Sequence, residues 1–231
     1  MTIENREFEA SSNYYGTLRP AFADLFPSKV GNVLDVGCGR GEYLRMCRER
    51  GASRLVGVEL RSDTAALLRA ESYVSEVVVG GIDDLSAEPY RAAFDLIVAG
   101  FVLEHVPNPW HTLSKLKTML SEGGHILVSL PNVRFWRVSA GLLFRGQWTY
   151  EREGVLDWTH LRFFSHKTML GLFRDTGLLV EATTSEFSSR AQSLDRLTLG
   201  SMRELLAYGY NFRLRLDPDF DHSSSVEAPA L

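Results

Sequence analysis

Three glycines alternate in the stretch VLDVGCGRGEYL, Val33–Leu44, directly after an apolar run. Glycine-rich loops that follow strands let a ligand approach the backbone closely, and many of them bind phosphate. A P-loop would continue with Gly-Lys-Ser/Thr, but here Gly41 is followed by Glu42 and Tyr43. A dinucleotide fingerprint, G-x-G-x-x-G, that starts at Gly37 would need a glycine at Glu42. The loop therefore matches neither of these phosphate motifs.

Acidic residues around the loop indicate a cationic ligand that carries a ribose. Asp35 and Glu42 bracket the glycines and would repel a pyrophosphate, whereas they would favour a positive charge. Glu59 ends the next apolar run, RLVGVEL, where an acid can accept both hydroxyls of a ribose. S-adenosylmethionine has an adenosine, a sulfonium and an α-amino group. We therefore expect it as the ligand, with S-adenosylhomocysteine as the product.

Short apolar runs alternate with helical stretches through the middle of the chain. The runs NVLDV, RLVGVEL, SEVVV, FDLIVAG and HILVSLP are typical of strands buried on both faces. Among the helices between them, we expect one capped by Ser62 and one that begins at Pro109 and ends at Gly123 and Gly124. Repeated strand–helix units with short connections predict an α/β fold with a doubly wound, mainly parallel sheet.

The regular pattern is interrupted once. Residues 132–164 contain three tryptophans and five arginines without a clean strand–helix unit. After them, Ser165 is expected to cap a helix that ends at Gly177, and LLVEATT and YNFRLRL are expected as the last strands. We predict a disordered lead over residues 1–12, one domain over residues 13–218 with an insertion at 132–164, and a disordered tail over residues 219–231.

At these motifs the sequence resembles the class I S-adenosylmethionine-dependent methyltransferases. The segments LDVGCGRG, VGVEL, FDLIVAGFVLEHVPNP and LSEGGHILVSLPN occur in the order and spacing of that family, between about residues 13 and 184. The resemblance implies a seven-stranded, Rossmann-like methyltransferase fold with a substrate-cap insertion. The positions that it implies for the cofactor site are Tyr15, Arg19, Asp35, Gly37, Cys38, Gly39, Glu59, Leu60, Ile82, Asp83, Gly100 and Phe101.

One position departs from the family pattern. The family usually has an acid just after the third strand, as in G-D-x-x-D-L, but this chain reads GGIDDL with Gly81 at that place. Either Asp83 or backbone groups would then contact the adenine amino group. Tyr15 is also open to two interpretations, because it would either cover the cofactor carboxylate or simply pack an N-terminal helix.

The insertion is expected to form the acceptor pocket, because ligands of doubly wound sheets bind beyond the carboxyl ends of the strands. SLPNVRFWRV followed by LDWTHLRFFS resembles a bacterial subgroup associated with glycosyltransferases and surface polysaccharide synthesis. That resemblance implies O-methylation of a sugar or sugar-linked acceptor. The arginines suit an anionic acceptor, although they could equally pair with nearby acids or lie in solvent. The expected acceptor-site residues are Asn132, Trp136, Tyr150, Asp157 and Arg162.

A hydroxyl acceptor must lose a proton during methyl transfer, and histidine titrates in the required range. His160 in the insertion and His105 in LEHV are the two candidates. For each of them, the alternative is a histidine that orients a loop through hydrogen bonds. No metal site is predicted, because the spacing of Cys38 and Cys47 matches no metal motif.

The composition excludes several other classes. The chain has 231 residues, a net charge of −4 and 45% hydrophobic residues, which suits one domain and gives no basic surface for nucleic acid. No apolar run reaches the length of a membrane span, and the polar start MTIENREFEASS is not a signal peptide. With both cysteines reduced, we expect a cytoplasmic protein.

Two classes of function remain open at this point. The first is an enzyme that methylates a small molecule. The second is a protein that binds S-adenosylmethionine and regulates another enzyme without turnover. Methylation of protein or nucleic acid is a weaker third interpretation, because the sequence has no N-P-P-Y-type motif. The stretch RFWRVSAGLLFRG could also make weak peripheral contact with a membrane surface. The sequence leaves the oligomeric state open.

Overall fold

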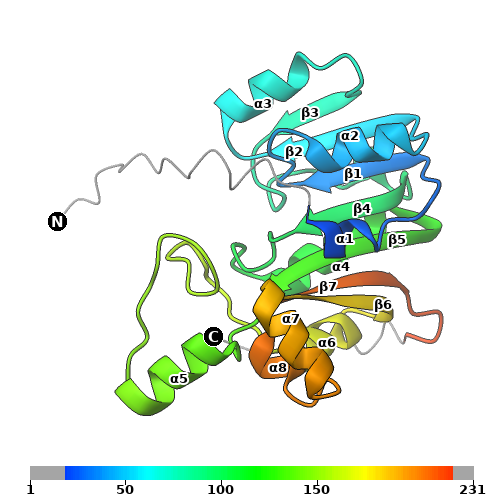
Figure 1. Cartoon of the computed structure of the whole chain (residues 1–231). Helices are drawn as coiled ribbons and strands as arrows, with labels where there is room; N and C mark the ends of the chain where they lie inside the picture. The colour runs from blue at the N-terminus through cyan, green and yellow to red at the C-terminus, as the bar shows by residue number, and fades with distance from the viewer. Residues whose placement is uncertain (1–18, 221–231) are drawn as a thin grey trace.

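A computed structural model describes residues 19–220 and contains a seven-stranded sheet with the order β3-β2-β1-β4-β5-β7-β6 (Figure 1). The first five strands are parallel, and β7 runs antiparallel to both of its neighbours. This arrangement confirms the predicted doubly wound, mainly parallel sheet. The strands are β1 Asn32–Val36, β2 Arg54–Glu59, β3 Glu76–Val79, β4 Phe94–Gly100, β5 Leu120–Pro131, β6 Leu178–Glu186 and β7 Gly209–Leu216.

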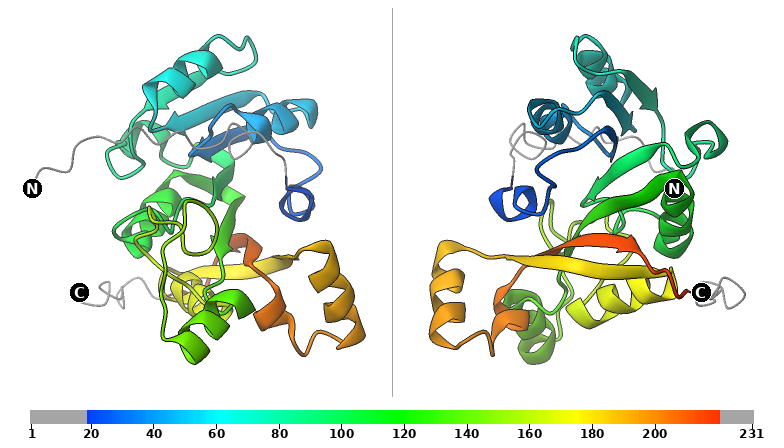
Figure 2. Two further views of the ribbon diagram at one scale, coloured as in Figure 1. Left: turned by 60° about the vertical axis from the view of Figure 1, so that its left-hand side comes forward. Right: turned by 90° about the vertical axis from the view of Figure 1, so that its right-hand side faces the viewer.

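Helices cover both faces of the sheet (Figure 2). Because successive strand residues point to opposite faces, Leu34 packs in the cluster that includes α4 and α6, and Val33 packs in the cluster that includes α1, α2 and α3. The helices are α1 Pro20–Ala23, α2 Glu42–Glu49, α3 Ser62–Arg69, α4 Pro109–Met119, α5 Trp136–Arg145, α6 His166–Asp175, α7 Ser189–Leu197 and α8 Arg203–Leu206, with a 3₁₀ turn at Glu88–Tyr90.

Local sequence signals account for several helix ends. Pro109 is the first residue of α4, and the Asn108 side chain accepts a hydrogen bond from the His111 backbone N–H at 3.0 Å. Ser165 caps α6 in a capping box with Thr168, as the sequence predicted for that serine.

Two local predictions were wrong, and one pair of helices was missed. Gly123 and Gly124 do not end α4, because the helix stops at Met119 and both glycines lie inside the long strand β5. Ser62 is the first residue of α3 and makes no cap hydrogen bond. The pair α7 and α8, which joins β6 to β7, was not predicted at all.

The strand order reverses between β1 and β4, so their following loops diverge and leave a crevice at the carboxyl edge. Val33 of β1 is in register with Leu55 of β2 and with Leu96 of β4. The glycine loop after β1, Glu59 at the end of β2 and Phe101 after β4 therefore lie at the same edge of three adjacent strands. This edge is the place where an open α/β sheet binds its ligands.

The insertion leaves the sheet and returns to it at one point. Asn132 and Phe164 form a β-bridge, and the backbone N–H of Val133 donates to the carbonyl of Phe164 at 2.8 Å. Between these ends, α5 projects from the body of the domain (Figure 1), and none of its residues is buried. Within residues 19–220, no helix is long and apolar enough to cross a membrane.

Candidate active site

The glycine loop makes a tight turn that needs glycine at defined positions. Gly37, Gly39 and Gly41 have φ values of 68°, 54° and 81°, in the left-handed region that other residues rarely adopt. The backbone N–H of Gly37 donates to the carbonyl of Val58 at 2.8 Å, which ties the loop to β2. A Cβ at Gly41 would also lie 2.5 Å from a methyl carbon of Leu68. The loop therefore presents bare backbone to the crevice.

Asp35 lies at the base of this loop as a buried carboxyl without a complete set of partners. Its side chain is 2% exposed, and Oδ2 has no hydrogen-bond partner among the described residues. Burial raises the pKa of Asp35 well above its usual value, and the charges of Glu42 and Glu59 raise it further. An unpartnered buried carboxyl is costly, so a ligand that brings a cation or an N–H donor would be stabilised here.

Glu59 connects the glycine loop to the turn after β2. Its Oε2 accepts a hydrogen bond from Gly39 N–H at 2.9 Å, and its Oε1 accepts one from Arg61 N–H at 2.9 Å. An ionised carboxylate can accept about four hydrogen bonds, so these two contacts fix its orientation and leave capacity for ribose hydroxyls. Leu60, which follows it, is 73% exposed at the crevice edge of the sheet.

Phe101 is held in an unusual backbone conformation directly after β4. Its φ is +56°, which is uncommon for a bulky residue and marks a constrained position. The guanidinium carbon of Arg19 lies 4.2 Å from the centre of the Phe101 ring, a cation–π contact. The preceding Gly100 lies against Phe22, where a Cβ would approach the ring to 3.1 Å. Tyr15, the other residue expected near the cofactor carboxylate, lies outside the described residues.

The turn after β3 is tied to α4. Asp83 is exposed, and its Oδ1 accepts a hydrogen bond from Thr112 Oγ1 at 2.8 Å. Lys115 Nζ donates to the carbonyls of Ile82 and Asp83 at 2.9 and 2.7 Å. Asp83 thus anchors the turn to α4, and its predicted contact with adenine stays a prediction. Cys38 is buried, and burial, reinforced by the charge of Asp35, raises the pKa of its thiol, so the thiol is neutral. Its predicted place in the cofactor site stays a prediction.

A cavity of about 950 Å³ lies between the insertion and the crevice. Phe101 and Arg19 line its inner end, and α5 and the following segment line its outer end. The other lining residues include Pro131, Phe135, Trp136, Arg137, Phe144, Arg145, Glu151, Glu153, Val155, Leu156, His160 and Tyr208. This cavity is the candidate acceptor pocket.

The predicted acceptor residues do not all reach this pocket. Trp136 lines it. Asn132 is fully buried, and its side-chain amide donates to the carbonyls of Glu204 and Ala207 at 2.7 and 2.8 Å. Arg162 donates to the carbonyl of Pro107. Asn132 and Arg162 therefore hold the ends of the insertion in place, because their polar groups are used by backbone carbonyls.

Asp157 and Tyr150 also act within the insertion. Asp157 is 3% exposed, and its Oδ1 accepts hydrogen bonds from the N–H and the hydroxyl of Thr159 at 2.8 and 2.7 Å. Tyr150 is 54% exposed and lies beside Phe163, with ring centres 6.3 Å apart. Neither of them belongs to the pocket lining.

The structure brings the two candidate histidines together. The rings of His105 and His160 meet edge to face with centres 4.8 Å apart. Burial lowers the pKa of both imidazoles, so both are neutral near neutral pH. His160 also lines the candidate acceptor pocket. The backbone N–H groups of Leu161 and Arg162 donate to the carbonyl of Glu104 at 2.8 and 3.0 Å, which docks the insertion on the LEHV loop.

Glu104 is a further residue of this site, in the same loop as His105. It is 0% exposed, and neither carboxyl oxygen has a hydrogen-bond partner among the described residues. Burial raises its pKa to about 8. The signal available in the sequence was its position in LEHV beside His105, but its burial depends on the insertion that covers it.

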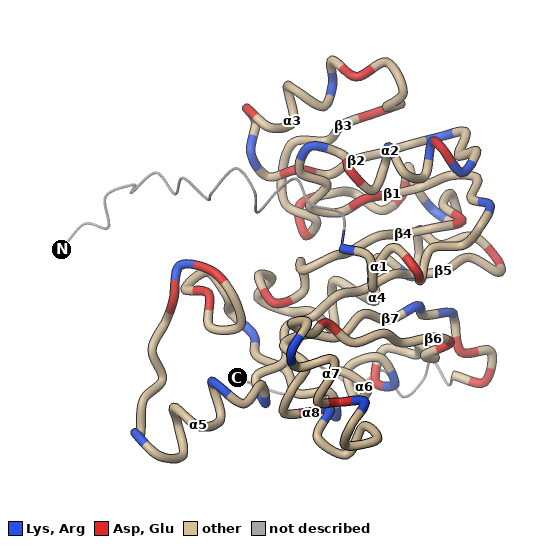
Figure 3. Tube along the Cα trace, viewed as in Figure 1, with Lys and Arg blue, Asp and Glu red and all other residues tan. Residues whose placement is uncertain are grey.

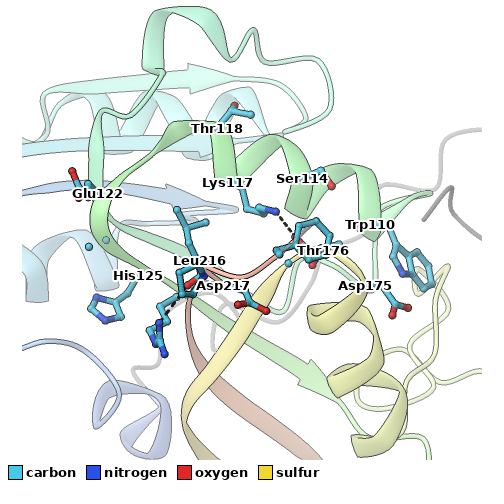
Figure 4. Close-up of a pocket in the computed structure, with 16 residues that line it drawn as sticks. Trp110, Ser114, Lys117, Thr118, Glu122, His125, Asp175, Thr176, Leu216 and Asp217 are labelled. Atoms are coloured by element: carbon cyan, nitrogen blue, oxygen red, sulfur yellow. Dashed lines mark hydrogen bonds between the residues drawn. The ribbon is translucent and has the colours of Figure 1, made fainter. Parts of the chain in front are cut away.

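A second cavity, of about 790 Å³, lies at the amino edge of the sheet (Figure 4). It is formed where α4 ends, β5 begins and α6 ends. Lys117 spans it, with a hydrogen bond to the carbonyl of Thr176 and its ammonium 4.7 Å from the centre of the Phe220 ring. This cavity is separated by the length of the strands from the glycine loop, so it is not part of the candidate active site.

The fold and the crevice define a Rossmann-like domain with a site for a nucleoside that carries a positive charge. A family model described as a methyltransferase domain matches residues 10–183, and the chain belongs to this family. The cofactor of S-adenosylmethionine-dependent methyltransferases fits the site described above, because its cationic end can meet Asp35 and its ribose can meet Glu59. When bound, it supplies a methyl group already activated on a sulfonium.

Relatives and solved structures agree with this family. The chain is 33% identical over 120 residues to a ubiquinone biosynthesis O-methyltransferase of Chromobacterium violaceum. The matched stretch covers 50% of this chain and 51% of that protein. It spans about half the length of the curated relatives it matches. A solved S-adenosylmethionine-dependent methyltransferase from Mesorhizobium loti superposes with a TM-score of 0.63 over 85% of this chain and 96% of that chain, at 22% identity. One from Archaeoglobus fulgidus gives 0.57 over 84% and 89%, at 18% identity. At such low identities, these structural likenesses show a shared fold and no more.

Proposed function

We propose that this protein is an O-methyltransferase that transfers the methyl group of S-adenosylmethionine to a hydroxyl of a small acceptor. The observation that carries the proposal is the shared wall of two sites. Phe101 directly follows the strand at the donor crevice, and it also lines the candidate acceptor pocket together with His160. An acceptor in this pocket would lie beside the donor, and alignment of the two reacting atoms is the main requirement of a direct displacement.

The polar groups at the inner end of the pocket suit a hydroxyl acceptor. A hydroxyl must lose its proton as the methyl group arrives, and a neutral imidazole can assist that loss. His160 faces the pocket as a neutral imidazole, and His105 lies against it. An amine acceptor that is already deprotonated would not need this pair.

For the acceptor itself, we propose a sugar or sugar-linked molecule. Aromatic side chains such as Trp136, Phe135 and Tyr208 offer flat faces on which a sugar ring can stack, and Arg19 and Arg137 offer donors for anionic groups. Figure 3 shows basic and acidic residues interspersed along the described chain, and the net charge of −4 does not favour binding of nucleic acid.

A phenolic acceptor with an apolar chain is the second candidate. Two observations favour it: the relatives named ubiquinone biosynthesis O-methyltransferase, and the apolar side chains that α5 exposes. Leu143 and Phe144 are 76% and 80% exposed, so they could contact an acceptor tail or a membrane surface.

The test is a transfer assay with S-adenosylmethionine labelled on its methyl group. One set of acceptors contains nucleotide sugars and glycans, and the other contains catechol-type and quinol-type phenols. We expect label in an alkali-stable methyl ether in one set, and none with an Asp35→Asn control that binds the donor weakly. Methylation of an amine, or of protein, would contradict the proposal. If the donor binds tightly and no acceptor is labelled, a non-catalytic binding protein becomes the better interpretation.

A further inference from the structure

Three potential metal ligands meet where the insertion docks on the sheet. Glu104 and His105 come from the loop after β4, and His160 comes from the insertion. One ligand atom of each residue lies within 4.8 Å of those of the other two. Four-coordinate ligands about 2.0–2.2 Å from a zinc ion lie about 3.4 Å from one another. The distance between any two of these ligand atoms would therefore have to shorten by up to about 1.4 Å for the three side chains to hold an ion.

Hydrogen bonds at Nδ1 hold both histidines in the tautomer that suits a metal ligand. Nδ1 of His160 lies 3.1 Å from the carbonyl oxygen of Val155. Nδ1 of His105 lies 3.3 Å from the carbonyl oxygen of Thr159 and 3.1 Å from its hydroxyl oxygen, whose proton is donated to Asp157. Because a carbonyl oxygen can only accept, both Nδ1 atoms carry the proton and both Nε2 atoms keep a free lone pair. This is the arrangement in which metal-binding histidines are usually held.

Glu104 supplies the second, independent observation. Its carboxyl group is completely buried, and both oxygens lack a partner among the described residues. A buried carboxyl group normally has hydrogen bonds or a counter-charge, because leaving it alone costs several kcal/mol. Arg19 is stacked on Phe101 and makes no hydrogen bond to either oxygen.

We propose that Glu104, His105 and His160 bind a divalent transition-metal ion, which lies at the inner end of the candidate acceptor pocket. Three protein ligands leave at least one position for water or for an acceptor hydroxyl, as in catalytic zinc sites. Two imidazoles and one carboxylate favour zinc over magnesium and calcium, which prefer oxygen ligands alone. This site could not be predicted from the sequence, because the proposed ligands come from segments that only the fold brings together.

The role of the ion rests on the proposed function, whereas its binding does not. An acceptor hydroxyl that takes the open position would have a lower pKa, and its proton would pass to solvent water. The resulting oxygen forms the new bond to the methyl carbon, and the bond from that carbon to sulfur breaks with its electron pair left on sulfur. His160 would then serve as a metal ligand in place of the general base that the sequence suggested.

The experiment measures binding directly, without acceptor. Protein stripped with a chelator is titrated with Zn²⁺ by calorimetry and with Mn²⁺ by electron paramagnetic resonance, and Mg²⁺ serves as the weakly binding comparison. We expect one ion per chain and a higher melting temperature with Zn²⁺. The variants Glu104→Gln and His160→Ala should each bind Zn²⁺ at least about a hundredfold more weakly, because loss of an outer partner alone costs about 10- to 100-fold.

Matched variants exclude nonspecific effects. His111→Ala removes an exposed histidine at the start of α4 and should bind Zn²⁺ like the wild type. Thr159→Val removes the hydroxyl beside His105 Nδ1 and should weaken binding about 10- to 100-fold. Glu104→Gln keeps the side-chain shape, and its circular dichroism and melting temperature without metal show whether it is folded.

The outcomes separate this proposal from the proposed function. If folded wild-type protein binds no Zn²⁺ or Mn²⁺, or if Glu104→Gln and His111→Ala bind equally well, the metal site is refuted, even if methyl transfer is observed. If Zn²⁺ binds as expected but no hydroxyl is methylated, the metal site stands and the proposed function fails. If transfer is equally fast in chelator, the ion has no role in the reaction.

Discussion

Replacement of Glu59 by alanine is the sharpest test of the donor site. In the structure its two oxygens each accept one backbone hydrogen bond, from Gly39 and Arg61, both at 2.9 Å. With the donor bound, the same carboxylate is expected to accept both ribose hydroxyls. A hydrogen bond to a charged group contributes about 1.5–3 kcal/mol, so loss of two such bonds should cost about 3–6 kcal/mol of binding free energy. That corresponds to about 10²- to 10⁴-fold in the dissociation constant.

Calorimetry with S-adenosylhomocysteine measures this change. Glu59→Gln keeps one carbonyl oxygen and should lose less affinity than Glu59→Ala. Glu42→Gln removes an equal charge beside the same loop and should change affinity by less than about fivefold, because a charge without a direct contact contributes little. Unfolding by urea must be recorded for each variant, since Gly39 N–H also loses its partner. If folded Glu59→Ala binds within threefold of the wild type, the ribose assignment is refuted.

The remaining predictions concern other parts of the site. The raised pKa of Asp35 means that the folded state holds its proton more tightly, so the contribution of Asp35 to stability should be largest below about pH 3.9 and should be lost as pH rises to the raised pKa. Asp35→Asn should flatten this part of the pH profile measured by urea unfolding, and an unchanged slope would contradict the prediction. His160→Ala should lower the rate of methyl transfer about 10²- to 10⁴-fold with little change in donor affinity, and near-normal turnover would show that His160 has no chemical role. Phe144→Ser removes an exposed ring from α5 and should leave the melting temperature unchanged. It should weaken either the binding of the acceptor or the sedimentation of the protein with lipid vesicles. If neither acceptor binding nor vesicle sedimentation changes, α5 contacts neither the acceptor nor a membrane surface.

The sequence was sufficient to predict the sheet and the turn of the glycine loop, because those features depend on local residue types. Pro109 begins a helix and Ser165 caps one. The three glycines of the loop occupy the positions of the turn that need a positive φ. Gly123 and Gly124 misled the prediction, since two glycines after a helix normally end it. Here the chain extends directly after Met119 because Leu120 pairs with Phe94 at the start of the strand.

The acceptor side was harder to predict because its roles depend on long-range contacts. Asn132 follows a strand at the ligand edge, which favours a binding role, but two backbone carbonyls brought close by α8 use its amide. Glu104 belongs to a familiar sequence motif, yet only the returning insertion buries it and places His160 beside it. Burial and partner geometry of this kind arise from segments more than fifty residues apart.

The bridge between Asn132 and Phe164 has a consequence for how such proteins diversify. Because the chain departs from the sheet and comes back at one place, the residues in between form a closed loop whose length and content are not fixed by the strands. Exchange of this insertion would change the acceptor that the pocket binds, while the donor crevice, built from β1, β2 and β4, stays intact. Conversely, a protein whose insertion lacks His160 would keep the crevice but lose one of the groups that meet where the insertion docks on the LEHV loop. One scaffold could thus give rise to a series of enzymes with different acceptors, and also to proteins that only bind the donor.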